Sequence, residues 1–203
     1  MSLATVFTDT LQPWRTSVIQ TFGEPYVPPD SSKICRIASA SFPRPSAGNA
    51  PPGVLEVLHS PGHHEAAVTF HDPWTGTLLT GDTVLPGRLF AFNAAAVLAT
   101  MERLVSFAAT RPVTHVLGCH IEMTRRPGRD YPIGADYQPR ERALELPPAH
   151  LTAIRDAAAA PVAAPGVRAH PDFVLYAQPG ERDFGRLLRR GRAHKFLRKL
   201  AAR

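Results

Sequence analysis

The chain has 203 residues, of which 44% are hydrophobic, enough for one ordinary core and an appendage. No segment approaches the roughly 18 apolar residues of a membrane-spanning helix, and residues 1–9 lack the basic and apolar stretches of a secretion signal. The two cysteines, Cys35 and Cys119, belong to no Cys-x-x-Cys pair or disulfide framework. We therefore expect a soluble, cytoplasmic protein with free thiols, and we expect Cys119 to be a buried strand residue.

Positive charge is concentrated toward the C-terminus, although the formal net charge is only +6. Over residues 181–203, arginines and lysines are interleaved with phenylalanines and leucines in a basic amphipathic pattern that Gly185 and Gly191 interrupt. No RNA-binding signature accompanies the pattern, so the sequence predicts no specific nucleic-acid partner. We expect the arginines of this tail to stay in solvent. The apolar side chains expected to dock on the domain are Phe184, Leu187 and Leu188.

The chain divides into three parts by composition. Residues 1–53 are rich in proline and punctuated like loops, which predicts a partly ordered lead-in and an incomplete N-terminal part. Residues 54–160 carry the clearest periodicity and form the predicted domain. Residues 161–203 are expected to contain a linker, a short strand and the basic tail.

The periodicity of the domain predicts an alternation of strands and helices. Expected strands cover residues 54–59, 66–71, 77–81 and 113–117, and a late strand covers 172–176. Asn93 is expected to cap an amphipathic helix over residues 94–108, and a second helix is expected around 148–160. A strand, a helix and a returning strand in this order predict an α/β layered architecture.

Three potential metal ligands follow the predicted strands. They are His63 in Ser60-Pro-Gly-His63, Asp82 in Leu79-Thr-Gly-Asp82, and His120 at the end of the run that starts at Val113. Strand ends at one edge of a sheet can bring such residues together. Two histidines and one aspartate suit zinc and leave a coordination position open for water.

These three segments, in this order, resemble the second half of the metallo-β-lactamase superfamily. The resemblance covers roughly residues 54–160. The segments His120-Ile-Glu-Met-Thr, Pro127-Gly-Arg-Asp-Tyr-Pro132 and Tyr137-Gln-Pro are also similar to a bacterial subgroup of hydrolases with this fold. The resemblance implies an α/β fold, a metallo-β-lactamase-like αββα sandwich, and metal-dependent hydrolysis of a small-molecule ester, thioester, lactam-like or phosphoester substrate.

The resemblance also implies roles for the three residues. In the complete family site two Zn²⁺ ions are bound. His63 would bind the first ion and His120 the second, and Asp82, the expected catalytic residue, would bridge both.

The family carries an upstream His-x-His-x-Asp-His cluster, whereas the first histidine of this chain is His59. We therefore expect an N-terminally incomplete domain that binds zinc weakly and has impaired hydrolase activity. A missing strand would also expose a sheet edge, through which the chain could oligomerise. His64 is the best candidate for a substitute ligand, and His71 and His115 are expected to be structural.

Three hypotheses for this incompleteness stay open. The chain is a fragment or begins at a misplaced start; it is a degenerate, non-catalytic remnant; or it is a working enzyme with unusual ligands. In a related alternative it is a binding module that uses the basic tail for an acidic partner.

Overall fold

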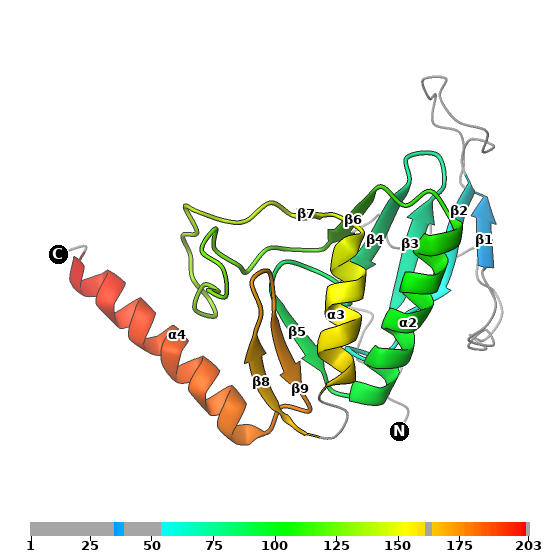
Figure 1. The fold of residues 1–203 in the computed structure, drawn as a ribbon. Helices are drawn as coiled ribbons and strands as arrows, with labels where there is room; N and C mark the ends of the chain where they lie inside the picture. The colour runs from blue at the N-terminus through cyan, green and yellow to red at the C-terminus, as the bar shows by residue number, and fades with distance from the viewer. Residues whose placement is uncertain (1–34, 39–53, 161–163, 202–203) are drawn as a thin grey trace, which may run out of the picture. The chain divides into compact units, whose positions relative to one another are not determined.

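The computed structural model describes residues 35–38, 54–160 and 164–201, all of which belong to one compact unit, Lys33–Arg203. Within these residues the chain is mixed α/β, with nine strands in two sheets and three helices (Figure 1). Most of the predicted lead-in, residues 1–34 and 39–53, lies outside the described residues. None of the described helices combines the length and the apolar character that crossing a lipid bilayer requires.

The larger sheet has six strands in the order β1-β2-β3-β4-β6-β7. Their bounds are β1 Cys35–Ala38, β2 Val54–His59, β3 Val68–Asp72, β4 Thr77–Gly81, β6 His115–Gly118 and β7 Glu145–Leu146. All neighbouring strands are antiparallel except β4 and β6, which are parallel. Alternate side chains of β3 and β4 are buried, because successive residues of a strand point to opposite faces.

The smaller sheet has the order β5-β9-β8. Its strands are β5 Arg88–Ala91, β8 Gly166–Ala169 and β9 Val174–Ala177. β5 is parallel to β9, and β9 is antiparallel to β8. Every residue of β9 is buried, so this strand forms the centre of the smaller sheet in both position and packing.

Two helices, α2 (Ala94–Thr110) and α3 (Ala149–Ala159), pack together and share one hydrophobic core with both sheets. Asn93 caps α2 as predicted, because its side-chain oxygen accepts a hydrogen bond of 3.0 Å from the backbone of Ala96. The core includes Leu78 of β4, Met101 of α2, Ile154 of α3 and Leu175 of β9.

The predicted strands over 54–59 and 77–81 and both predicted helices are present. The other three predicted strands are present but displaced by one or two residues, as β3, β6 and β9. The sequence did not predict β1, β5, β7 or β8. A connection from β4 through α2 to the parallel strand β6 is the predicted βαβ-like return.

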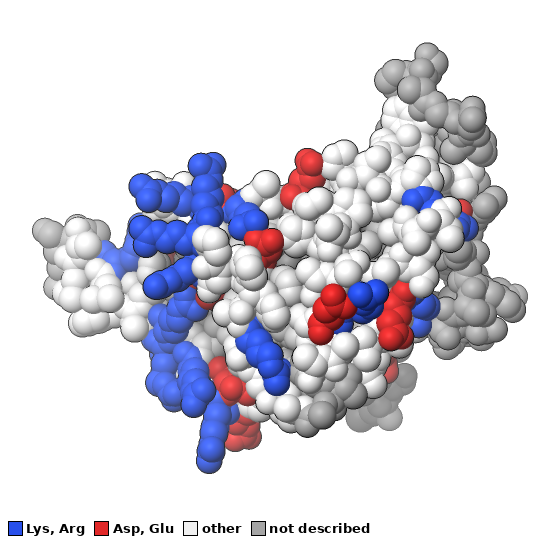
Figure 2. Space-filling view, viewed as in Figure 1, with Lys and Arg blue, Asp and Glu red and all other residues white. Residues whose placement is uncertain are grey.

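The C-terminal helix α4 runs unbroken from Glu181 to Ala201, so the two glycines do not interrupt it. Leu187 is buried and Phe184 stacks on Phe90, as the docking prediction requires. Leu188 is 47% exposed, so its predicted docking is wrong. Lysines and arginines gather over α4 and over the segment between β6 and β7, residues 119–144, which we call the β6–β7 excursion (Figure 2).

Helix α4 has few buried residues, and Gly191 is the point at which it packs closely on the β6–β7 excursion. A Cβ atom at this position would lie 2.6 Å from the backbone oxygen of Ile133, which belongs to the β6–β7 excursion. Any side chain here would therefore push α4 away from the excursion. At Gly185 the nearest atom to a built Cβ is the end of the Arg189 side chain, at 3.6 Å, which is ordinary contact.

Gly191→Ala and Gly185→Ala form a matched pair that tests this contact. We expect Gly185→Ala to stabilise the fold by up to about 1 kcal/mol, because alanine favours helix more than glycine does. Gly191→Ala should destabilise it by about 1–2 kcal/mol, since overpacking costs about 1–3 kcal/mol. Urea unfolding measures both. Equal stabilisation by the two substitutions would contradict the close packing of α4 on Ile133.

Candidate metal centre

The candidate site lies where three strands of the larger sheet end. β4 and β6 are parallel neighbours with Gly81 opposite Gly118, so their carboxyl ends meet at one edge. β2 runs in the same direction as β4, because both are antiparallel to β3. Asp82 directly follows β4, His120 follows β6 and His63 follows β2. Sheet topology therefore brings together the three residues that the sequence singled out.

The turn before His63 is held against the N-terminal part of α2. Gly62 has a φ of +139°, and a Cβ there would lie 2.3 Å from the side chain of Val97. The carbonyl of Gly62 accepts a hydrogen bond of 3.3 Å from the backbone of Asn93, and Thr100 donates one of 2.8 Å to the carbonyl of Pro61. Only glycine fits this approach, which fixes the position of His63.

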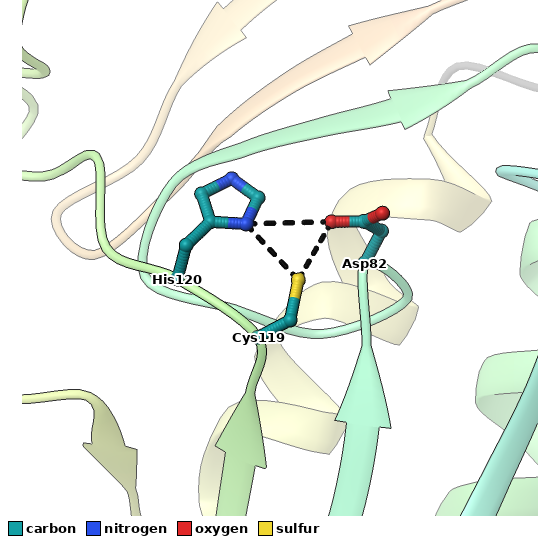
Figure 3. A group of neighbouring side chains, drawn as sticks. All are labelled: Asp82, Cys119 and His120. Atoms are coloured by element: carbon teal, nitrogen blue, oxygen red, sulfur yellow. Dashed lines mark hydrogen bonds and ion pairs between the residues drawn. The ribbon is translucent and has the colours of Figure 1, made fainter. Parts of the chain in front are cut away.

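Asp82 is the centre of the group. Its Oδ1 accepts a hydrogen bond of 2.9 Å from the thiol of Cys119 and lies 3.5 Å from Nδ1 of His120. The Cys119 sulfur is 3.0 Å from the same Nδ1 (Figure 3). His63 lies on the other side, with Nε2 3.8 Å from Oδ2 of Asp82. Each carboxylate oxygen of Asp82 thus faces a histidine.

Cys119 is a residue of this group that the sequence prediction misplaced. It was expected to be a buried strand residue, but β6 ends at Gly118 and Cys119 is exposed. A Cβ at Gly118 would lie 2.3 Å from the side chain of Leu85, so only glycine fits at the end of β6. The signal was available in the sequence, since Cys119 follows this glycine and directly precedes His120.

Partial burial of the sulfur, followed by the hydrogen bond to Asp82 and the charge of Asp82, raises the pKa of the Cys119 thiol to about 12. The residue as a whole is exposed, but its sulfur is partly shielded from water. Without a cation the thiol therefore stays protonated and donates its hydrogen to Asp82.

The donor set of the group fits a divalent cation. Ligand atoms of Asp82, Cys119 and His120 all lie within 4.8 Å of one another. Carboxylate, thiolate and imidazole are the usual protein ligands of zinc, and in a tetrahedral site such atoms are separated by about 3.3–3.6 Å. Small outward movements of the three side chains would make room for an ion.

The surroundings of the group also bear on metal binding. Nδ1 of His63 is buried without a hydrogen-bond partner among the described residues, while the ring lies beside Phe92. A pocket of about 260 Å³ is lined by residues that include His63, His64 and Asp82. On the far side of His120, Nε2 lies 3.6 Å from Oε1 of Glu122, which can orient the ring.

The remaining histidines do not join the group. Nδ1 of His64 accepts a hydrogen bond of 3.1 Å from the backbone of Ala66, and the side chain is exposed. His71 is fully buried and pairs with Glu56, and His115 pairs with Glu145. His64 is therefore a neighbour of the pocket and not a member of the close group.

Alkylation of Cys119 tests the role of Asp82 in the apo protein, because only the thiolate reacts. We expect slow labelling by iodoacetamide at pH 8, and faster labelling in Asp82→Asn, by about tenfold for each pKa unit removed. Asp136→Asn, the same change of charge on an exposed residue of the excursion, serves as the control. Mass spectrometry of the Cys119 peptide measures the rate. An equal rate in the wild type and in Asp82→Asn would contradict the hydrogen bond.

No family model matches the chain, and neither a curated protein nor a solved structure is significantly similar to it. A function for this chain must therefore be argued from the side chains that its fold brings together.

Proposed function

We propose that the chain binds one zinc ion through Asp82, Cys119 and His120 and acts as a metal-dependent hydrolase with a metallo-β-lactamase-like fold. The observation that carries the proposal is the convergence of three different zinc-binding side chains, those of Asp82, Cys119 and His120, at the ends of β4 and β6. Three protein ligands leave a fourth position open, which is the arrangement of catalytic zinc sites.

A bound zinc ion would supply Lewis acidity for the hydrolysis of an ester, thioester or lactam-like bond. The residues of the chain have distinct roles in this proposal. Asp82 would hold the ion together with Cys119 and His120, its Oδ2 faces His63, and Glu122 lies beside His120, where it can orient the ring. His63, with one ring nitrogen near Asp82, is placed to bind substrate or to move a proton in the adjacent pocket.

The proposed αββα sandwich is supported by the packing of both sheets and two helices into one core. Support for the resemblance also comes from where its motifs lie. His63, Asp82 and His120 each follow a strand of the same sheet, and β4 and β6 are joined through α2. Cys119 adds a ligand that the resemblance does not supply, which favours one ion over two.

Zinc binding should depend on the close group and not on nearby histidines. When free zinc is kept high enough during dialysis to fill a weak site, we expect about one equivalent of zinc in the wild type, measured by elemental analysis. Cys119→Ser and His120→Ala should each weaken binding by at least about tenfold, because each removes one of three ligands. Zinc should also protect Cys119 from alkylation.

His64→Ala is the matched control, since this exposed histidine lines the same pocket without joining the ligand group. It should bind zinc as the wild type does. Loss of zinc in His64→Ala but not in Cys119→Ser would overturn the assignment of ligands. A second tightly held ion that is lost in His63→Ala would replace the proposal of one ion by the two-ion site of the family.

Hydrolytic activity should require bound zinc. We expect the zinc-loaded chain to hydrolyse at least one of a set of chromogenic ester, thioester, lactam and phosphodiester substrates. EDTA should abolish the activity and added zinc should restore it, and His120→Ala should lose it. A chain that holds zinc with full occupancy and hydrolyses none of these substrates would contradict the hydrolase and favour a non-catalytic metal-binding protein.

A further inference from the structure

A second pocket, of about 640 Å³, lies in the β6–β7 excursion, and none of the candidate metal ligands lines it. Its volume is within the range of about 300–1,000 Å³ typical of small-molecule sites. Among the described residues that line it, Asp130 is the only acidic one. The basic residues in its lining are Arg125, Arg126, Arg129, Arg140 and Arg190.

Most of these arginines have no anionic partner within the described part of the chain. No hydrogen bond or ion pair there involves the guanidinium groups of Arg126, Arg129 or Arg140, and that of Arg125 uses only Nε, to the backbone of Glu141 at 3.3 Å. The other N–H groups of these side chains are available to a ligand.

Asp130 does not neutralise them. It is 8% exposed, and its carboxylate is already engaged by Nη1 of Arg88, at 2.7 Å, and by Arg190 of α4. Two guanidinium groups therefore balance this one carboxylate. No acidic side chain that lines the pocket neutralises the other four arginines of the described lining.

Local backbone structure holds these arginines in place. The segment from Arg126 to Arg129 is a β-turn with Pro127 at its second position and Gly128, with a φ of +69°, at its third. The backbone N–H of Arg129 donates to the carbonyl of Arg126 at 3.2 Å, and that of Gly128 donates to the carbonyl of Pro171 at 3.0 Å. The turn fixes Arg126 and Arg129 within about 7 Å of each other, measured between Cα atoms.

Arg140 is held beside this turn by two hydrogen bonds within the excursion. Its carbonyl accepts a hydrogen bond of 2.9 Å from the backbone of Arg125, and its N–H donates one of 2.9 Å to the hydroxyl of Tyr131. Like charges brought together without counter-charges repel, so this arrangement weakens the free protein unless an anion is bound. Such locally unfavourable arrangements occur at functional sites.

We propose that this pocket binds a small ligand through a phosphate or diphosphate group. Guanidinium groups form paired, charge-assisted hydrogen bonds to phosphate oxygens, and four of them around one pocket match the charge of a diphosphate. A small ligand fits better than a nucleic acid, because the free arginines line one concave pocket. Tyr131, an aromatic residue of the lining, accepts a hydrogen bond at its hydroxyl from the backbone N–H of Arg140.

Calorimetric titration of the full chain with sodium pyrophosphate tests the proposal, with EDTA present so that the metal centre cannot contribute. Wild type should bind pyrophosphate more tightly than inorganic phosphate. The double substitution Arg126→Gln and Arg129→Gln should weaken binding by at least about tenfold. It should not lower the thermal midpoint of the free protein, because it relieves repulsion and breaks no bond.

The matched control is Arg189→Gln with Arg192→Gln, which removes the same charge from two exposed residues of α4 outside the pocket. It should bind pyrophosphate within about twofold of wild type, since exposed charges at a distance are largely screened. Equal weakening in the two double variants, or no binding of millimolar pyrophosphate by wild type, would overturn the proposal that this pocket binds phosphate groups.

A single-stranded oligonucleotide forms the third arm of the experiment. Its binding should be weak and should fall steeply with salt, because it would rest on exposed charge alone. Tight binding of the oligonucleotide that is lost equally in both double variants would replace the small phosphorylated ligand by a nucleic acid. Failure of this test leaves the zinc proposal unaffected, because no zinc ligand lies in the pocket.

Discussion

The guanidinium of Arg88 is almost fully removed from water, and two carboxylates compensate for that burial. Arg88 is 6% exposed and pairs with Glu122 and Asp130, both in the β6–β7 excursion. An unpaired charge at this depth would cost several kcal/mol. The excursion is therefore anchored to the smaller sheet at two points. Glu122 also lies beside His120, and Asp130 also pairs with Arg190 of α4.

The candidate metal centre depends on a different feature, the common direction of β2, β4 and β6. Because these strands end at one edge, short loops are enough to bring His63, Asp82 and His120 together. The strands determine which residues meet, and the contacts of the loops determine how closely. The separation between His63 and Asp82 is thus set by α2, which holds the turn at Gly62.

Sequence patterns predicted the elements that are rich in apolar residues, and failed where the chemistry of the residues was unusual. α2 has a regular apolar period and was predicted to within two residues, and the apolar runs of β2 and β4 were predicted with their observed bounds. β5 begins with Arg88, and a buried arginine cannot be recognised without its partners. Cys119 was expected to be a buried strand residue, but β6 ends at Gly118 and Cys119 lies just beyond it, exposed. The closeness of Cys119 to Asp82 depends on the pairing of β4 with β6, which local periodicity does not encode.

The β6–β7 excursion leaves and rejoins the larger sheet at adjoining positions, since Leu117 of β6 lies opposite Glu145 of β7. A segment whose ends are already held together behaves as an insertion, because the entropy of closing it changes only slowly with its length. The sheet and the helices that pack on it thus place little constraint on the content of this insertion. Proteins built on the same sheet can therefore diverge in the ligand they recognise by exchanging this segment, provided that the two acids facing Arg88 and the candidate metal ligands Cys119 and His120 are kept.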